Sequence, residues 1–300
     1  MERFVIVEVG STNTKAYLYH DSIVEDLDFL TIEFKNHFKK EGCLSSVDKQ
    51  TLFSFIKKIE EEHIFVFGTS VFRNLNTLEK EAWLKEFKNA TGLLFHIVSS
   101  DMENEFTVYG AISGIDYRGK IAVMIGGGGS TELSIVEDGK IIEKANSSFG
   151  AMDVTDMFSD LREDYAITDY DFMVSKVKEL VSVPKNRASF MILAGGDYIY
   201  YYEELNYPVQ ENKFYYHPLQ PYCLDVNTMD QLDKNFFYSV SLEEICKKTG
   251  KDGWWRGARG MRLCVKSLVD ILGVKYIIPT RISMVYGIVE KIKKDDFIFD

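Results

Sequence analysis

The pattern of hydrophobic and polar positions along the chain predicts a series of short strands and helices. The strands that open this series are repeated later in the chain. Residues 3–9 and 14–20 are largely apolar and flank the turn Gly-Ser-Thr-Asn, which predicts a β-hairpin. A third strand is expected over residues 25–35. The other elements expected in this half are helices within 49–62, 77–90 and 101–114 and strands at 63–68 and 93–98.

The same opening returns near residue 118. A strand at 120–125 leads into Gly-Gly-Gly-Gly-Ser-Thr, and two further strands flank the turn at Asp138-Gly139. An apolar strand at 189–196 ends in glycines, whereas the tyrosines of 200–240 are interpreted as packing residues. The other elements expected are helices near 151–160, 169–182, 241–249, 255–272 and 282–293 and a strand at 274–278.

This repetition predicts a duplicated α/β unit with a boundary near residue 118. A chain of 300 residues is long for one hydrophobic core and suits two domains. The hydrophobic fraction of 46% supplies enough apolar side chains for both cores.

Charge and composition exclude several classes of function. The chain has 35 Lys+Arg against 46 Asp+Glu, a net charge of −11, which argues against a nucleic-acid surface and against attraction to anionic membranes. The four cysteines are scattered, which indicates reduced thiols, and the histidines lack metal-binding spacing. The sequence contains no signal peptide pattern and no apolar run of about 18 residues. We therefore expect a soluble, cytoplasmic protein without a nucleic-acid or membrane partner.

Three stretches combine a strand with a turn of small residues: VEVGSTNTK (7–15), MIGGGGSTE (124–132) and ILAGGDY (192–198). Glycine lets backbone N–H groups approach a phosphate closely, and successive N–H groups form an anion-binding nest. A single turn of this kind is as well explained by a plain hairpin. Three of them at repeated positions favour phosphate binding.

These motifs resemble the superfamily of actin, Hsp70 and the sugar and acetate kinases. Within it, VEVGSTNTKAYL, IGGGGSTELSIVEDGKI, FGTSVFRN (67–74) and VSSDMENEF (98–106) are similar to the exopolyphosphatase / guanosine pentaphosphate phosphohydrolase family. The resemblance implies an α/β fold of two duplicated ribonuclease H-like (actin-like ATPase) domains with an interdomain cleft. The domains would be residues 1–118 and 119–281, with a C-terminal helix in 282–300 packing on the first.

The resemblance also implies roles for individual residues. Glu103 would act on the attacking water, Glu132 would assist it, and Glu132 and Glu8 would hold Mg²⁺ or Mn²⁺. The residues implied to hold substrate phosphates are Gly10, Ser11, Thr12, Asn13, Arg73, Gly127, Gly128, Gly129, Ser130, Thr131, Gly195 and Gly196.

Each assignment has a simpler alternative. Glu103 is also explained as a first-turn acid favoured by the helix dipole, with Ser100 or Asp101 as the cap. Glu132 could pair across the strands with a lysine such as Lys140, and Arg73 could pair with Glu79. Lys15 could reach a phosphate or be a solvated strand residue. Arg256, Arg259 and Arg262 could supply cations or form a solvated helix face.

Several positions depart from the family pattern. Ile125 replaces a metal-linked aspartate, and Gly126 replaces an apolar residue. Glu105 and Asp153 stand where the family has cations, and Asp197 stands where it has a threonine. The reversed charges would repel a long polyanion.

The leading hypothesis is a phosphoanhydride hydrolase that releases terminal phosphate from polyphosphate or a guanosine pentaphosphate-like substrate. The departures motivate a second hypothesis, a catalytically impaired regulator that binds phosphate or a nucleotide. A small-molecule kinase of the same superfamily ranks third. The expected partner is polyphosphate or a nucleotide polyphosphate, and the resemblance allows a homodimer.

Overall fold

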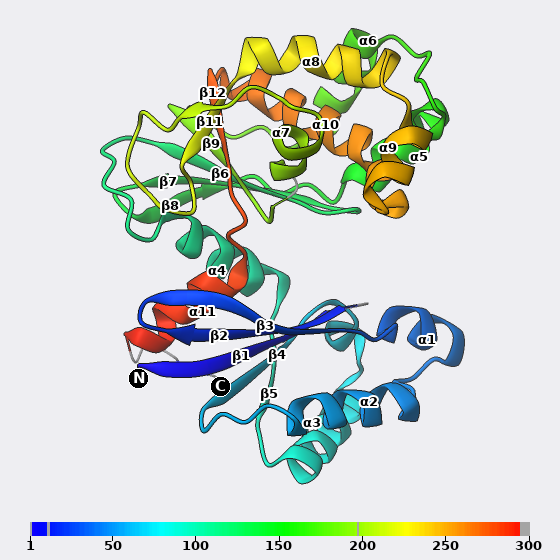
Figure 1. Ribbon diagram of the computed structural model, residues 1–300, viewed down its shortest axis with the longest axis vertical. Coiled ribbons are helices and arrows are strands. Elements are labelled where there is room, and N and C mark those ends of the chain that lie inside the picture. The colour runs from blue at the N-terminus through cyan, green and yellow to red at the C-terminus, as the bar shows by residue number, and fades with distance from the viewer. Residues whose placement is uncertain (1, 11–12, 197, 295–300) are drawn as a thin grey trace. The chain divides into compact units, whose positions relative to one another are not determined.

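The computed structural model describes residues 2–10, 13–196 and 198–294 (Figure 1). The chain divides into two units: unit 1 comprises Met1–Phe106 with Met284–Asp300, and unit 2 comprises Thr107–Ser283. The division falls inside helix α4 (Ser100–Ile112), before the loop near residue 118. None of the described helices is long and apolar enough to cross a membrane.

Unit 1 contains a five-stranded sheet in the order β3-β2-β1-β4-β5. The hairpin strands β1, β2 and β3 pair antiparallel, while β4 and β5 extend the sheet in parallel. The strands are β1 (Arg3–Val9), β2 (Asn13–His20), β3 (Ile23–Thr31), β4 (Ile64–Gly68) and β5 (Phe95–Ile97). Alternation along β1 sends Val5, Val7 and Val9 into one core, and sends Phe4 and Ile6 to the opposite face.

Helices cover both faces of this sheet. The core built on Val5, Val7 and Val9 also includes side chains of α1 (Phe34–Glu41), α2 (Ser46–Lys57) and α3 (Thr77–Thr91). Helix α11 (Met284–Lys293) packs Val285 and Ile288 against Phe4 and Ile6 on the other face. A Cβ added to Gly287 would lie 1.9 Å from the carbonyl oxygen of Phe106, so glycine is required where α11 meets α4.

The sheet of unit 2 repeats this topology. Its order is β10-β11-β12-β9-β6-β7-β8, and the five strands β8-β7-β6-β9-β12 have the order and directions of the sheet in unit 1. The strands are β6 (Ile121–Gly126), β7 (Thr131–Glu137), β8 (Lys140–Lys144), β9 (Phe190–Ala194), β10 (Gln210–Glu211), β11 (Tyr222–Asp225) and β12 (Tyr276–Pro279). The predicted duplication of an α/β unit is therefore visible in the topology.

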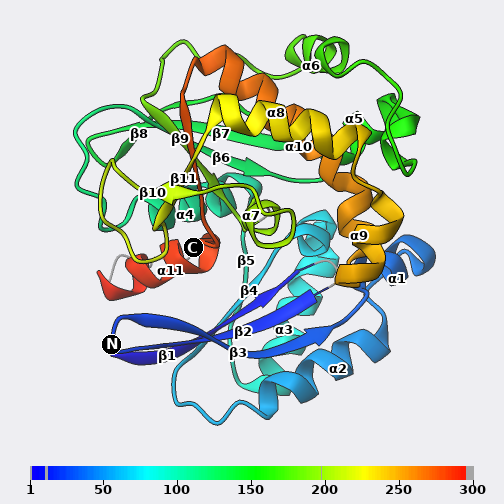
Figure 2. The same ribbon diagram turned by 45° about the horizontal axis from the view of Figure 1, so that its top comes forward.

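Unit 2 has most of its helices between β8 and β12. They are α5 (Ala151–Met157), α6 (Tyr170–Lys178), α7 (Ile199–Glu204), α8 (Val226–Tyr238), α9 (Leu242–Thr249) and α10 (Asp252–Leu272). Figures 1 and 2 both show α8 and α10 alongside each other over the sheet. Buried side chains of α10, including Trp255, Leu263 and Leu268, belong to the core of this unit.

Two arginines of α10, Arg259 and Arg262, are buried inside unit 2. The sequence predicted that they would either supply cations to a ligand or form a solvated helix face, and both predictions are wrong for these two residues. The guanidinium of Arg259 is fully buried and donates to backbone carbonyl oxygens, including those of Glu163 at 2.8 Å and Asp164 at 2.9 Å. Arg262 is also fully buried and pairs with Asp233. Arg256 is partly exposed and pairs with Asp252 at 3.0 Å.

Three helices were not predicted. The expected strand over 25–35 ends at Thr31, and α1 begins at Phe34. The unassigned stretch 200–240 contains most of α7 and the whole of α8. The interpretation of its tyrosines as packing residues is confirmed for Tyr201, Tyr207 and Tyr215, which are buried.

Candidate functional site

The two glycine turns close their hairpins in the same way. The amide of Gly10 donates to the carbonyl oxygen of Asn13 at 2.9 Å, and the amide of Gly127 donates to that of Ser130 at 2.9 Å. Each turn thus spans two residues between equivalent strand ends. Ser11 and Thr12 lie outside the described residues, so the first predicted phosphate loop is defined here by Gly10 and Asn13.

In the second turn, two backbone amides point away from α5, the helix that anchors the turn. The carbonyl oxygens of Gly127 and Gly128 accept hydrogen bonds from Ala151 at 3.0 Å and Met152 at 2.7 Å, at the start of α5. In a trans peptide the C=O and the following N–H point in opposite directions. The amides of Gly128 and Gly129 therefore point away from α5. They make no hydrogen bond with the described part of the chain, which leaves two adjacent donors for an anion.

Gly126, at the start of this turn, and Gly150, at the start of α5, lie in close contact with their surroundings. None of Gly126 to Gly129 has a left-handed φ. A Cβ on Gly126 would lie 2.4 Å from the sulfur of Met261, so a larger residue there would require this flexible side chain to shift. A Cβ on Gly150 would lie 2.4 Å from the carbonyl oxygen of Gly127. Gly150, which was not predicted as a site residue, therefore allows α5 to anchor the turn.

Thr131 and Asp153 form hydrogen bonds with backbone groups of unit 2 next to the turn. The hydroxyl of Thr131 donates to the carbonyl oxygen of Phe149 at 2.9 Å, and its amide donates to Ser147 at 3.0 Å. Both donors predicted for phosphate are thus engaged inside the unit. The carboxylate of Asp153 accepts from the amide of Gly150 at 2.9 Å, so this acid caps α5 beside the turn.

The third glycine turn uses its amides differently from the prediction. Gly195 and Gly196 have left-handed φ values of 93° and 87°. Their amides donate to the carbonyl oxygens of Ile282 at 2.9 Å and Thr280 at 2.8 Å. These bonds tie the end of β9 to the segment after β12 and occupy the donors predicted to bind phosphate. Asp197 lies outside the described residues.

In unit 1, Glu103 and Arg73 form an ion pair. Glu103 lies in the first turn of α4, where Ser99 caps the helix in place of Ser100 or Asp101: the amide of Met102 donates to the Ser99 hydroxyl at 3.2 Å. Nη1 of Arg73 lies 2.7 Å from Oε2 of Glu103, and the two side chains are 26% and 35% exposed. The alternative partner of Arg73 is excluded, because Glu79 instead caps α3 with Asn76.

Glu8 is the second acid of this group. It faces Lys15 across the hairpin. Burial raises the pKa of Glu8, the nearby charge of Lys15 opposes that rise, and the negative charge of Glu103 adds to it. The Tyr17 hydroxyl also hydrogen-bonds to the Glu8 carboxyl. Glu103 therefore interacts with both Glu8 and Arg73.

The equivalent registers of the two hairpins show which residues of unit 1 correspond to Ile125 and Glu132. Val9 pairs with Thr14 and Glu8 with Lys15, while Gly126 pairs with Thr131 and Ile125 with Glu132. Ile125 therefore occupies the position of Glu8, and Glu132 occupies that of Lys15. The alternative pairing of Glu132 with Lys140 does not match the register, which places Lys140 opposite Glu137.

The carboxylates fit a magnesium ion that keeps most of its ligands from water and phosphate. Within the described residues, no group of three or more His, Cys, Asp or Glu side chains is arranged to hold a metal. Mg²⁺ commonly binds one or two carboxylates together with waters and substrate phosphate oxygens. Glu8 meets this requirement best, because a cation would offset both its burial and its repulsion from Glu103.

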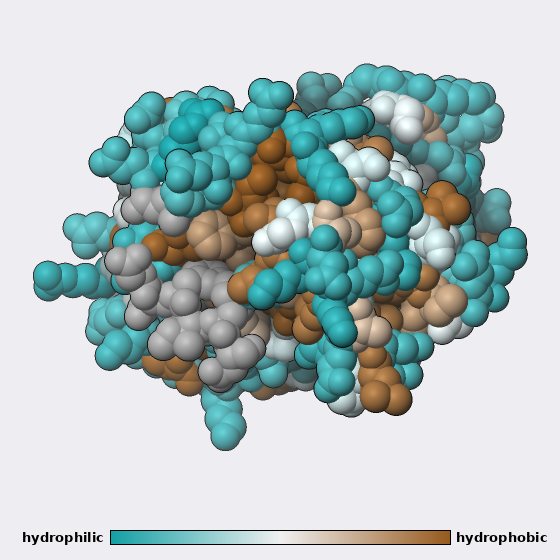
Figure 3. Space-filling model, turned by 90° about the horizontal axis from the view of Figure 1, so that it is seen from below, coloured by the Kyte–Doolittle hydropathy of each residue, from teal (hydrophilic) through white to brown (hydrophobic). Residues whose placement is uncertain are grey.

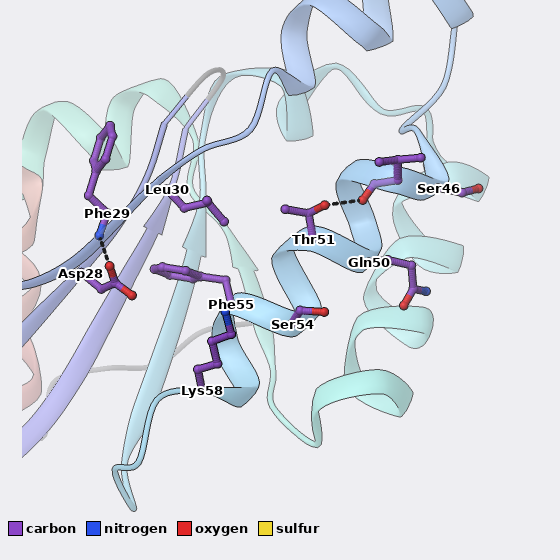
Figure 4. Close-up of a pocket in the computed structure, with 10 residues that line it drawn as sticks. Asp28, Phe29, Leu30, Ser46, Gln50, Thr51, Ser54, Phe55 and Lys58 are labelled. Atoms are coloured by element: carbon purple, nitrogen blue, oxygen red, sulfur yellow. Dashed lines mark hydrogen bonds between the residues drawn. The ribbon is translucent and has the colours of Figure 1, made fainter.

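A large surface hollow lies apart from all of these residues. It has a volume of about 770 Å³ and lies between β3 and α2. Figure 4 shows Phe29 and Leu30 of β3 opposite Gln50, Ser54 and Phe55 of α2. Hydrophobic side chains on the face shown in Figure 3 lie in separate patches among hydrophilic ones. No predicted site residue lines this hollow, so it is not part of the candidate site.

The topology and the glycine hairpins define a two-unit α/β protein with a glycine turn anchored by α5 in unit 2 and a carboxylate–guanidinium pair in unit 1. A family model described as the Ppx/GppA phosphatase family matches residues 34–194. The chain belongs to this family of phosphatases, and the fold predicted from the sequence is confirmed.

Solved structures support the fold. A Ppx/GppA family member from Aquifex aeolicus superposes with a TM-score of 0.77 at 16% identity, covering 99% of both chains. An exopolyphosphatase from Cytophaga hutchinsonii superposes with a TM-score of 0.71 at 15% identity, covering 98% of both chains. Identities this low establish similarity of fold alone.

A sequence relative is the bifunctional 3-dehydroquinate synthase/phosphatase of Fusobacterium nucleatum. It is 27% identical over 208 residues, which are 64% of the present chain. The chain covers 31% of the length of that protein.

Proposed function

We propose that this protein hydrolyses phosphoanhydrides or phosphate esters, with Glu103 orienting and deprotonating the attacking water. The observation that carries the proposal is the ion pair between Glu103 and Arg73 at the start of α4. A carboxylate can take a proton from water, and a guanidinium beside it can hold phosphate oxygens. The word "phosphatase" in the names of the family and of the Fusobacterium nucleatum relative supports the same reaction class.

The glycine turn of unit 2 would bind phosphate through the amides of Gly128 and Gly129. Glu8 is the stronger candidate for a Mg²⁺ or Mn²⁺ ligand, and Glu132 is the second. When bound, the ion would neutralise negative charge on the phosphate oxygens. Terminal phosphate of polyphosphate or of a guanosine pentaphosphate-like nucleotide is the proposed substrate group, as the sequence resemblance implies.

The test is phosphate release in the presence of Mg²⁺ or Mn²⁺ from short and long polyphosphate, guanosine pentaphosphate and ATP. Glu103→Gln should lower release at least about 100-fold, because removal of a general base typically costs that much. Asp101→Asn is the matched control, since it removes an exposed acid from the same helical turn. Equal activity of Glu103→Gln and the native protein would refute the role of Glu103.

A second candidate function is a regulator that binds phosphate or a nucleotide without hydrolysis. Ile125 supplies no carboxylate where the equivalent strand of unit 1 has Glu8, and Asp153 places an acid beside the turn. This candidate predicts binding without release from any of the four substrates. Metal-dependent release would exclude it.

A further inference from the structure

Strand β3 forms an open edge of the sheet in unit 1. Among the described strands it pairs only with β2, so its outer side has no strand partner there. Residues 25–29 are exposed one after another, which indicates that no described segment covers this stretch. A long exposed edge presents main-chain N–H and C=O groups on which another chain can pair. With nine residues, β3 is long enough for such pairing.

The main chain at Phe29 is turned to this open side. Its amide donates to the carboxylate of the neighbouring Asp28 at 2.8 Å, so it does not point toward β2. In an antiparallel strand, the N–H and the C=O of one residue point to the same side. The carbonyl group of Phe29 therefore also faces outward. An incoming strand would pair with this residue after displacing one hydrogen bond to a side chain.

The equivalent edge strand of unit 2 differs from β3. Strand β8 has five residues, which alternate between exposed and half-buried positions. The carboxylate of Glu143 in β8 accepts hydrogen bonds from the amides of Lys185 at 2.7 Å and Asn186 at 2.9 Å. A later segment of the chain thus lies against β8, whereas β3 has a continuous exposed stretch. The open edge is therefore a property of unit 1 and not of the duplicated fold.

The hollow of about 770 Å³ lies beside this edge, between β3 and α2 (Figure 4). Leu30 and Phe55 supply apolar surface in it, and Ser54 supplies a hydroxyl group. Successive side chains of a strand point to opposite faces of a sheet. Every second side chain of a strand added to β3 would therefore lie on the face that α2 covers, next to the hollow. Main-chain pairing at an edge, with room for alternate side chains, is a recurring mode of peptide recognition.

The charge of β3 decides which kind of chain fits this edge. Its exposed stretch contains Glu25, Asp26 and Asp28 and no cation. The register in which two whole copies of β3 overlap antiparallel would place Asp26 opposite Asp28, and like charges in opposite positions are destabilising. The net charge of −11 adds repulsion between two copies of the chain. Lysine or arginine side chains would instead form favourable pairs of opposite charge.

We propose that β3 and the hollow bind an extended segment of another protein in which basic and apolar residues alternate. The main chain of that segment would pair with β3. Its basic side chains would face the acids of β3, and an apolar side chain would contact Leu30 and Phe55 in the hollow. This binding surface is separate from the phosphate chemistry of the proposed function, because none of the residues assigned to that chemistry lines it.

Two pairs of variants test the two parts of this surface. Phe29→Pro removes an outward amide, and proline is tolerated at edge positions where the N–H does not serve the sheet. Phe29→Ala keeps the amide and is the control for the lost ring. Ser54→Trp fills the hollow from an exposed position of α2. Ser175→Trp, at an exposed position of α6 that does not line the hollow, is its control.

Binding is measured by fluorescence anisotropy with two labelled peptides of nine residues, the length of β3. One peptide alternates lysine with valine, and the other alternates glutamate with valine. The native protein should bind the lysine peptide at least about 10-fold more tightly than the glutamate peptide. Phe29→Pro should bind the lysine peptide at least about 10-fold more weakly than Phe29→Ala, and Ser54→Trp more weakly than Ser175→Trp by a similar factor. Hydrogen exchange of amides in β3 should slow when this peptide binds.

Equal binding by Phe29→Pro and Phe29→Ala would overturn strand addition at β3. If Phe29→Pro does not fold, equal binding by Ser54→Trp and Ser175→Trp overturns the inference by itself. No binding of the lysine peptide, or equal binding of both peptides, would do so as well. A native dimer that Phe29→Pro alone converts to a monomer in analytical ultracentrifugation would assign the edge to a second copy and thereby overturn the proposed partner. None of these results depends on phosphate release.

Discussion

Nη1 of Arg73 lies 2.7 Å from Oε2 of Glu103, so the cation expected to hold phosphate is paired with the carboxylate expected to act on water. The two residues come from different elements, the 3₁₀ helix Ser70–Asn74 and α4. A phosphate bound by Arg73 would compete with Glu103 for the guanidinium. Substrate binding would thereby release the carboxylate for its reaction with water.

We expect Arg73→Gln to raise KM for the best substrate at least about 10-fold, because loss of a charge-assisted hydrogen bond costs roughly 1.5–3 kcal/mol. The free energy of unfolding should change by less than about 1 kcal/mol, since exposed ion pairs contribute little. Steady-state kinetics and urea unfolding measure the two effects. Arg73→Lys, which retains the charge, is the comparison. An unchanged KM in Arg73→Gln would show that the arginine only positions Glu103.

Ile125→Asp should make stability depend on divalent cations. The new carboxylate would lie opposite Glu132 across the hairpin, and like charges in directly opposite positions are destabilising by up to about 1 kcal/mol. Magnesium should offset the repulsion and raise the melting temperature of this variant. Thermal unfolding in EDTA and in magnesium measures the effect, with Ile125→Asn as the uncharged control. A melting temperature unaffected by magnesium would argue against a metal position at this hairpin.

Gly150→Ala should destabilise unit 2 by about 1–3 kcal/mol, the usual cost of overpacking. The added methyl group would overlap the carbonyl oxygen of Gly127 and separate α5 from the turn. Gly253→Ala is the matched control. Its methyl group meets open space in a helix, where alanine is favoured over glycine by roughly 0.5–1 kcal/mol. Urea unfolding of both variants should give opposite signs, and equal stability would contradict the packing described for the turn.

His37 should make stability depend on pH. Its Nδ1 lies 2.8 Å from Oδ2 of Asp48, and this hydrogen bond raises the pKa of His37 above its ordinary value of 6.5. The folded protein therefore binds this proton more tightly than the unfolded chain. The resulting stabilisation is complete below pH 6.5 and is lost as the pH rises through the raised pKa. Urea unfolding between about pH 5.5 and 8.5 should reveal this loss in the native protein and not in His37→Gln. Parallel curves would refute it.

The two hairpins could be predicted because the sequence pattern that specifies each one lies within a short, continuous stretch of the chain. Alternating apolar positions on both sides of Gly10 and of Gly126–Gly129 specify two strands and a turn, and the register follows from the turn length. The first-turn position of Glu103 was predictable for the same reason, although the capping residue is Ser99.

The burial of Arg259 could not be predicted, because its acceptors are carbonyl oxygens of residues 19 to 98 positions away in the chain. Arg262 is similar, since its partner Asp233 comes from α8. The close contact at Gly126 also depends on a distant residue, Met261. Such tertiary contacts are absent from local sequence patterns.

The packing of α11 on β1 has a consequence for biosynthesis. Unit 1 begins at the start of the chain, yet the apolar face around Phe4 and Ile6 is covered by side chains of α11, which are translated only after all of unit 2. Unit 2 can therefore complete its own core while unit 1 still awaits a helix. During translation, the unit that the ribosome makes first is the one that finishes folding last, and its apolar face stays uncovered by α11 in that interval.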